Sequence, residues 1–220
     1  MQPLLVFDLD GTLIDSAPDI VTAVNKTLKK YNKPQLDTET IIAHIGEGLK
    51  KLIGDFFIND NLSALEQAQL ENDFIQIYES VMLEQTFIFP GVEKFLDSYQ
   101  GPIGIITNKN ERLAKAVVDH LGLNRYPWIK IFGADSLPEK KPSALPLQTM
   151  MKLAGHTPQN TFMIGDGTPD MASAQNAGVP AIAVSFGYTS IEILRKFQPQ
   201  GLLDHYSKLG DLLGTLTNAL

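Results

Sequence analysis

The pattern of apolar and polar residues changes in character along the chain. From about residue 16 to residue 86, apolar residues recur at the spacing of amphipathic helices, and strand-like runs are few. From about residue 90 onward, short buried strands alternate with helices. We predict strands over residues 4–7, 103–107, 129–132, 161–164 and 181–184. We predict a helix that begins at residue 16, and further helices over residues 41–57, 62–83, 91–99, 111–121, 145–154, 169–177, 191–197 and 206–216.

Buried strands that alternate with helices indicate an α/β fold with a parallel, doubly wound, Rossmann-like sheet. The first strand has no partner nearby in the sequence, so we expect it to pair with strands that follow residue 100. The helical segment between them is then an insertion. We therefore predict an α/β core made of residues 1–15 and 87–220, with an inserted α-helical cap domain over residues 16–86. The cap is expected to move as a lid about hinges near Asp15 and Thr86.

The start of the first helix carries a recognisable capping pattern. Ser16 precedes the apolar periodicity, and Pro18 falls in the first turn, where a missing N–H costs nothing. Asp19 stands three residues after Ser16, which is the spacing of a capping box. We therefore expect Ser16 to be the N-cap and Asp19 to reach back to it.

Composition narrows the class of protein. The formal net charge is −7, which disfavours nucleic acid as a partner because phosphate backbones select basic surfaces. There is no cysteine, so neither disulfides nor thiolate metal sites occur. The longest apolar runs are too short to span a bilayer, and the first residues lack the charged region of a signal peptide. We expect an intracellular, cytoplasmic protein with no membrane partner; no feature indicates an oligomeric state.

Polar residues gather at the ends of three predicted strands and in one loop. Ligands of an open parallel sheet bind at the carboxyl ends of its strands, so these residues are expected to converge. They are Asp8 and Asp10 after the first strand, Thr107, Asn108 and Lys109 after the second, Asp166 and Asp170 after the strand over 161–164, and Lys140-Lys141-Pro142 before the helix at 145.

Four acids held close together repel one another and need a cation. They offer only oxygen ligands, with no His or Cys beside them, which points to Mg²⁺ rather than Zn²⁺. Magnesium retains coordination sites for water and phosphate. The Thr107 hydroxyl, the Asn108 amide and a lysine are the groups that a phosphate requires opposite the metal. The pattern therefore predicts metal-assisted phosphoryl chemistry on a small phosphorylated metabolite.

Two aspartates separated by one residue can divide the chemistry between them. Asp8 directly follows the buried strand, so it is the more rigidly held and the better nucleophile for an aspartyl-phosphate. Asp10 lies on the same side of the strand because side chains alternate with period two. It can protonate the leaving oxygen and then deprotonate the water that cleaves the acyl-phosphate. Gly11 lets the backbone approach the metal closely.

Four sequence motifs occur in order along the chain: residues 8–12 (DLDGT), 107–108 (TN), 141–142 (KP), and 165–166 (GD) with Asp170. They resemble those of the haloacid dehalogenase superfamily of phosphatases, which also carries a helical cap after its first strand. The similarity to phosphoglycolate phosphatases covers nearly the whole chain. The stretches that carry it are residues 15–19, 45–48, 89–92, 107–109, 134–138 and 186–188.

The resemblance implies a role for each motif. Asp8 is the nucleophile and a metal ligand, and Asp10 is the general acid/base that binds metal through its carbonyl. Lys141 neutralises Asp8 and the phosphoryl oxygens, so it counts as both catalytic and substrate-binding. Asp166 binds the metal, and Asp170 supports it directly or through water. The substrate-binding residues are Thr107 and Asn108, with Lys141 and Thr12 beside them.

Two positions depart from the family pattern. Ala144 stands where a proline is frequent, and Gly167 stands where a serine is frequent. The first change affects loop stiffness, and the second removes a hydroxyl next to the metal. Neither removes a catalytic group.

The implied reaction is Mg²⁺-dependent hydrolysis of a phosphomonoester, first of all 2-phosphoglycolate. Sugar phosphates and pyrophosphate are alternative substrates, because the cap sets specificity. Lys50 and Lys51 of the cap can pair with a substrate carboxylate, or can simply be solvated. A phosphomutase or phosphonate hydrolase shares the same core, and the phosphonate enzymes need a cap lysine for a Schiff base. A phospho-acceptor binding module is the non-enzymatic alternative, although such modules lack a cap and an equivalent of Asp10.

Overall fold

Six parallel strands form one sheet in the order β5-β4-β1-β6-β7-β8 in the computed structural model, which describes residues 2–217. β1 lies inside the sheet, with β4 on one side and β6 on the other, so the strand order reverses there. The predicted doubly wound fold is therefore confirmed. The strands are β1 (Leu4–Phe7), β4 (Ile103–Ile106), β5 (Trp128–Phe132), β6 (Thr161–Gly165), β7 (Ala181–Val184) and β8 (Gly201–Leu203).

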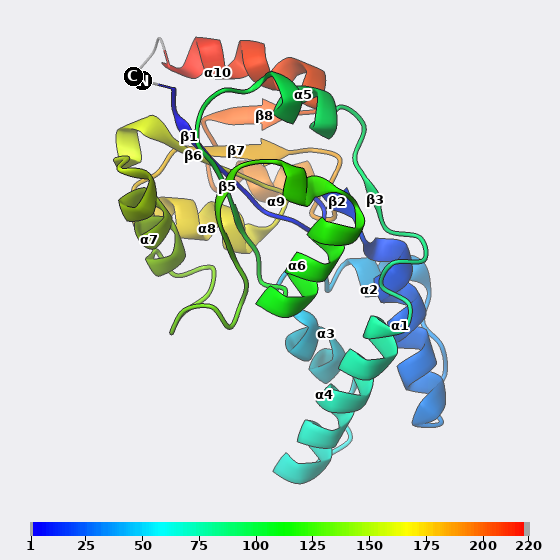
Figure 1. Cartoon of the computed structure of the whole chain (residues 1–220). Helices are drawn as coiled ribbons and strands as arrows, with labels where there is room; N and C mark the ends of the chain where they lie inside the picture. Colours follow the sequence, from blue (N-terminus) through cyan, green and yellow to red (C-terminus); the bar gives the residue numbers. More distant parts are fainter. Residues whose placement is uncertain (1, 218–220) are drawn as a thin grey trace.

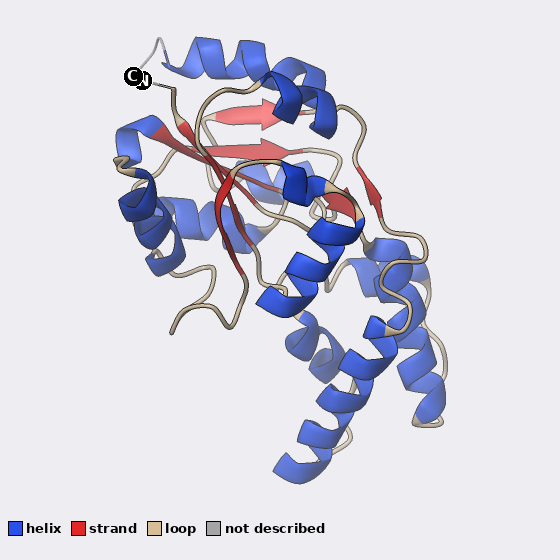
Figure 2. Cartoon of the chain, viewed as in Figure 1, coloured by secondary structure: helices blue, strands red, loops and turns tan. Residues whose placement is uncertain are grey.

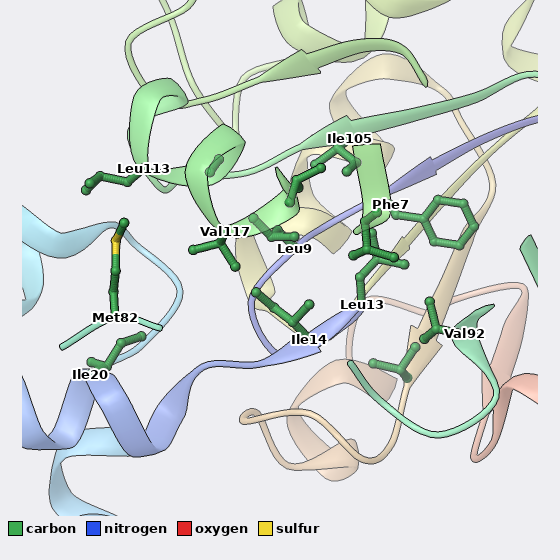
Figure 3. Packing of buried hydrophobic residues seen from close by; sticks show 14 of the residues in the cluster. Phe7, Leu9, Leu13, Ile14, Ile20, Met82, Val92, Ile105, Leu113 and Val117 are labelled. Carbon is green, nitrogen blue, oxygen red and sulfur yellow. The ribbon is translucent and has the colours of Figure 1, made fainter. Parts of the chain in front are cut away.

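Helices cover both faces of this sheet (Figure 2). The alternation of side chains along β1 explains why two layers are needed. Leu5 and Phe7 belong to one hydrophobic cluster, to which α5, α6 and α10 contribute, whereas Leu4 and Val6 belong to a second, with α7, α8 and α9. Figure 3 shows Phe7 in the first cluster with Val92 of α5 and Val117 of α6. These helices are α5 (Val92–Ser98), α6 (Glu111–His120), α7 (Leu145–Ala154), α8 (Thr168–Ala177), α9 (Ile191–Arg195) and α10 (Leu209–Thr217).

Four further helices lie beyond the carboxyl end of β1 (Figure 1). They fall within residues 16–86, which we call the cap segment. A short antiparallel pair, β2 (Ile14–Asp15) and β3 (Phe87–Ile88), joins the two points where the chain enters and leaves this segment. The four helices are α1 (Ala17–Lys30), α2 (Thr38–Ile42), α3 (Leu49–Phe56) and α4 (Ala64–Glu79).

The helix predicted over residues 41–57 is wrong in one respect, because α2 and α3 are separate helices. Gly46 and Gly48 between them have φ angles of 128° and 99°. These values are outside the helical region and are readily adopted by glycine alone, so the chain leaves the helix there. The result is a loop over residues 43–48, which we call the cap loop.

Three strands and two 3₁₀ turns, at Leu123–Arg125 and Pro158–Asn160, were missed by the hydrophobic pattern. β2 and β3 have two residues each and β8 has three, too few for a period of two to be visible. They form because a distant segment supplies their hydrogen-bonding partner: β3 is far from β2 in sequence, and β8 pairs with β7. The predicted helix over 206–216 begins as a 3₁₀ turn at Tyr206–Lys208 before α10.

The capping box expected at Ser16 is also wrong, although α1 does begin there. The backbone N–H groups of Ser16 and Ala17 donate to the Tyr188 hydroxyl at 2.9 and 3.1 Å, so a tertiary partner replaces the local cap. Asp19 is fully buried and accepts bonds from the Gln85 and Thr86 N–H groups and from the Thr86 hydroxyl. Both residues thus fasten the linkers of the cap segment. None of the helices within residues 2–217 is both long and apolar enough to cross a membrane.

Candidate active site

The polar strand ends meet at the reversal point of the sheet, as the strand order requires. Asp8 follows β1, Thr107 follows β4 and Asp166 follows β6, and these three strands are adjacent. Lys141 reaches the same place from the loop between β5 and α7, and its side chain is 1% exposed. All four side chains are buried.

Lys141 joins two of the clustered carboxylates. Its ammonium lies 2.8 Å from Asp8 Oδ1 and 2.5 Å from Asp170 Oδ1, and it also donates to the Ile106 carbonyl at 2.7 Å. All three donors of the ammonium are therefore used. Asp8 Oδ1 accepts a second bond from the Leu9 N–H at 2.7 Å. Two donors thus orient the Asp8 carboxylate through its Oδ1 oxygen.

Asp166 is oriented by two donors from different parts of the chain. The Thr12 hydroxyl donates to Oδ1 at 2.9 Å and the Tyr188 N–H donates to Oδ2 at 2.9 Å. Thr12, predicted to bind substrate, is therefore engaged with this carboxylate, and its substrate contact stays a prediction. Gly11 is required here, because its φ is 80° and a Cβ would lie 2.3 Å from Asp166 Oδ2.

Asp170 lies in the first turn of α8 and is 1% exposed. Its Oδ2 accepts the Gly167 N–H at 2.8 Å while its Oδ1 faces Lys141. Asp8, Asp166 and Asp170 each place a carboxylate oxygen within 4.8 Å of the other two. Gly167, the departure from the family pattern, contributes its backbone rather than a hydroxyl. Three acids thus share one lysine, which leaves an excess of buried negative charge.

Burial and this excess of negative charge raise the pKa values of two of the carboxyl groups. Burial, and then the negative charge of Asp170, raises the pKa of Asp166 to about 7. Burial raises the pKa of Asp8 well above its usual value, with Asp170 adding to the effect and Lys141 opposing it. Burial alone would lower the pKa of Lys141, but Asp170 and Asp8 outweigh it and raise that pKa, so the lysine stays charged. The cluster therefore lacks one or two positive charges.

A divalent cation with a preference for oxygen supplies what is missing. Magnesium accepts carboxylate oxygens, and Asp8, Asp166 and Asp170 provide three within a small volume. The close backbone at Gly11 leaves no side chain in the way. The donor set contains no His or Cys, which fits a hard cation rather than Zn²⁺. The residues present therefore fit the predicted Mg²⁺.

The side chain of Asp10 lies apart from this cluster. Both of its oxygens accept bonds from the Lys109 ammonium, at 2.7 and 2.8 Å, and Oδ1 also accepts the Ser16 hydroxyl at 2.5 Å. Asp8 and Asp10 nevertheless line the same cavity. One acid thus lies in the cluster and the other lines the space beside it, and the division of roles between them stays a prediction. The Asp10 carbonyl as a metal ligand also stays a prediction.

Thr107 and Asn108 also line that cavity. The Thr107 hydroxyl oxygen accepts the Lys109 N–H at 3.1 Å, which leaves the hydroxyl proton free to be donated. The Asn108 amide donates to the carbonyls of Gly46 and Lys141, at 3.1 and 3.2 Å. Asn108 therefore links the strand end to the cap loop. Its phosphate contact stays a prediction.

The cap loop closes over the site. Besides the Asn108 contact, the Lys140 ammonium donates to the Glu47 carbonyl at 2.5 Å. The cavity beneath the loop has a volume of about 30 Å³ and is partly open to solvent. A buried water needs about 10–15 Å³ on this measure, so the space holds about two waters. The cap loop and the strand ends are therefore in direct contact at the site.

The two cap lysines expected near a substrate carboxylate lie elsewhere. Lys50 pairs with Glu71 at 2.9 Å and Lys51 pairs with Asp55 at 2.9 Å, and neither lines the cavity beside Asp8 and Asp10. Lys51 lines a neighbouring pocket with Gly46 and Thr168. Sequence reasoning placed Lys109 at the strand end but gave it no role, and it gave none to Tyr188; in the structure they contact Asp10 and Asp166. Their signal was position, because Lys109 directly follows Thr107-Asn108 and Tyr188 follows the end of β7.

The fold and this cluster define a class of hydrolase. A profile of the haloacid dehalogenase-like hydrolases matches residues 5–184, and the chain belongs to that family. The resemblance predicted from the four motifs is therefore confirmed.

Individual relatives of this chain have names more specific than that of the family. A phosphoglycolate phosphatase of Chromobacterium violaceum is 39% identical over 196 residues, which cover 86% of this chain and 88% of the relative. Another, of Neisseria meningitidis, is 35% identical over 196 residues, covering 86% and 83%. A crystal structure from Haemophilus somnus, of a predicted phosphoglycolate phosphatase, superimposes with a TM-score of 0.87 at 24% identity, covering 96% and 97%. The predicted enzyme class, a phosphatase, is confirmed by these relatives.

Proposed function

We propose that the protein is a Mg²⁺-dependent phosphatase that hydrolyses 2-phosphoglycolate through an aspartyl-phosphate on Asp8. The observation that carries the chemistry is the shared use of Lys141 by Asp8 and Asp170, with Asp166 beside them. The names of the relatives support the substrate. We propose that the reaction takes place in the cytoplasm on a small metabolite, without a nucleic-acid or membrane partner.

Asp8 begins the reaction in this proposal. Its carboxylate oxygen bonds to phosphorus while the bond from phosphorus to the ester oxygen breaks. Lys141 holds Asp8 in orientation, and Thr107 donates its hydroxyl to a phosphoryl oxygen. Asp8, Asp166 and Asp170 would hold Mg²⁺, with the Asp10 carbonyl as a further ligand. When bound, the ion neutralises charge on the phosphoryl oxygens.

Asp10 moves the protons. It gives a proton to the departing ester oxygen, which leaves as the hydroxyl of glycolate. It then takes a proton from the water that attacks the phosphorus of the aspartyl-phosphate, which releases phosphate and restores Asp8. Its place in the cavity wall, outside the carboxylate cluster, supports this role.

We also propose that residues 16–86 act as a cap domain that opens for substrate. The cavity beneath the cap loop has a volume of about 30 Å³, which holds about two waters. Opening would break the cap-loop contacts of Asn108 with Gly46 and of Lys140 with Glu47. It would also separate the ion pair between Arg112 of α6 and Glu79 of α4. The hinge would lie at β2 and β3, where the linkers cross.

The other members of the superfamily fit less well. A phosphonate hydrolase needs a cap lysine at the site, and Lys50 and Lys51 are paired with cap acids instead. A phospho-acceptor module has no need for a group such as Asp10 beside the nucleophile.

The test is phosphate release, with Mg²⁺ and with EDTA, from a panel of substrates. The panel is 2-phosphoglycolate, several sugar phosphates, pyrophosphate, phosphonoacetaldehyde and p-nitrophenyl phosphate. We expect Mg²⁺-dependent turnover with the highest kcat/KM for 2-phosphoglycolate. Asp8→Asn is the control, and it should reduce release to background while the circular dichroism spectrum stays unchanged. Equal activity in Asp8→Asn would refute the nucleophile, and a better sugar phosphate would refute the substrate.

A further inference from the structure

One cationic side chain, that of Lys109, lines the cavity under the cap loop within residues 2–217. The wall that faces it is apolar or lacks side chains. That part of the lining consists of Ile20, Ile45, Gly46, Gly48, Leu49 and Leu52. An ammonium beside an apolar wall is costly unless it has an anionic partner. Lys109 therefore requires an explanation beyond the phosphate site, whose own lysine is Lys141.

Asp10 accounts for only part of the bonding capacity of Lys109. The ammonium can donate three hydrogen bonds, and the two bonds found within the described residues both go to Asp10. The side chain is 1% exposed, so water does not readily satisfy the third donor. On its other side, Nζ lies 5.0 Å from the centroid of the Tyr78 ring in α4. The Tyr78 hydroxyl is buried and has no hydrogen-bond partner in residues 2–217.

The ion pair with Asp10, at 2.7 Å, keeps Lys109 charged, and the ammonium retains one N–H beyond its two bonds to Asp10.

Lys109 lines the same cavity as Thr107, the residue that we expect to hold the phosphate. Its backbone N–H donates to the Thr107 hydroxyl oxygen at 3.1 Å, so both residues belong to one tight turn after β4. In 2-phosphoglycolate a single methylene separates the ester oxygen from the carboxylate. A ligand that short, with its phosphate at Thr107, would have its carboxylate in the same cavity as Lys109.

We propose that Lys109 binds the carboxylate of the substrate and so selects phosphate esters that carry a second anion one carbon away. This inference rests on the proposed function and deepens it. The competing explanation is that Lys109 serves only to orient Asp10. The two explanations differ in how the effect of a substitution depends on the substrate.

The test compares 2-phosphoglycolate with ethyl phosphate, which has the same skeleton but a methyl group in place of the carboxylate. For Lys109→Met we expect the ratio of the two kcat/KM values to fall by about 10- to 100-fold, the range for a lost charged hydrogen bond. Lys109→Gln, which keeps an N–H donor for Asp10, should lower the ratio in the same direction. Lys50→Met is the matched control and should leave both values unchanged, because Lys50 is exposed and paired with Glu71.

Binding to a variant that cannot turn over separates recognition from chemistry. In the Asp8→Asn protein with Mg²⁺, calorimetry should show that Lys109→Gln weakens 2-phosphoglycolate binding at least about tenfold more than ethyl phosphate binding. An equal loss for both ligands in both assays would overturn the proposal and leave Lys109 as a positioning residue for Asp10. A wild-type protein that turns over ethyl phosphate as well as 2-phosphoglycolate would instead refute the proposed substrate.

Discussion

At the scale of a single residue, Lys141 is the buried positive charge that two carboxylates share. It is 1% exposed and touches two of the three clustered carboxylates, at 2.8 and 2.5 Å. Replacing it with Met would leave those charges buried without a partner, which costs about 3–5 kcal/mol. We expect Lys141→Met to lower the free energy of unfolding in EDTA by that amount and to lose phosphatase activity. Urea denaturation followed by circular dichroism measures the change in stability.

Lys208 offers a matched control for that experiment. It pairs with Asp204 at 2.7 Å, but both side chains are more than half exposed. Exposed pairs contribute about 0.2–1 kcal/mol, so Lys208→Met should be nearly neutral. If Lys141→Met proved equally neutral, the carboxylates would have to be uncharged in the folded protein, and the electrostatic account of the site would be wrong.

At the scale of elements, Asp19 joins α1 to the second linker of the cap segment. Its carboxylate accepts both the Gln85 and Thr86 N–H groups and the Thr86 hydroxyl, at 2.7 to 3.1 Å. Asn in its place has one acceptor oxygen and directs N–H donors at N–H donors. We expect Asp19→Asn to cost about 1–3 kcal/mol, the penalty of an unsatisfied buried group, and to speed amide exchange at Gln85 and Thr86. Hydrogen exchange with mass spectrometry measures the second effect.

Asp37 is the comparison for this prediction, because its carboxylate accepts the Thr40 N–H at the exposed start of α2. Asp37→Asn should cost little, since Asn caps helices as well as Asp does. Unchanged exchange at residues 85 and 86 in Asp19→Asn would show that the linker is held by β2 and β3 alone.

At the scale of the whole molecule, the carboxylate cluster links stability to pH and to metal. Asp166 has a pKa of about 7 in the folded protein, against 3.8 for the free side chain. Between these values the folded state binds more protons than the unfolded state, so Asp166 makes the metal-free protein less stable as pH rises from about 4 to 7. Bound Mg²⁺ would replace those protons. We therefore expect the Mg²⁺-induced rise in Tm to grow from pH 5 to pH 8.

The size of that rise follows from mass action. At a Mg²⁺ concentration 100 times Kd, the gain is about 2.7 kcal/mol, or roughly 5–10 °C for a chain of this length. Differential scanning fluorimetry in Mg²⁺ and in EDTA measures it. Asp166→Asn should show a smaller gain with a weaker pH dependence. A gain that is already complete at pH 5 would contradict the linkage to Asp166.

The strand ends show how much of the candidate site can be predicted from a single sequence. The burial of Leu4–Phe7, followed at once by Asp8, was sufficient to predict a strand that delivers a carboxylate to the sheet edge, and the structure confirms that strand. The same reasoning predicted that Thr107, Lys141, Asp166 and Asp170 meet at one edge of the sheet, and they do lie together. It succeeded because a parallel sheet brings all its carboxyl ends to one edge, whatever the details of packing.

The pattern of apolar and polar residues did not predict contacts between segments that are distant in the chain. A period of two or 3.6 describes which face of an element is buried, but not which side chain meets it there. Tyr188 fastens Ser16 and Ala17; Asp19 holds Thr86 rather than its own helix; and Lys109 pairs with Asp10 from another strand.

The chemistry of this protein was therefore determined by its sequence, because reactive groups at strand ends are positioned by the backbone alone. The cap-loop contacts, the linker contacts and the lysine facing the cavity were decided only by the tertiary structure. Each of them depends on two segments more than 60 residues apart in the chain. No local pattern records such a pairing, because its free energy exists only once both segments are folded against each other.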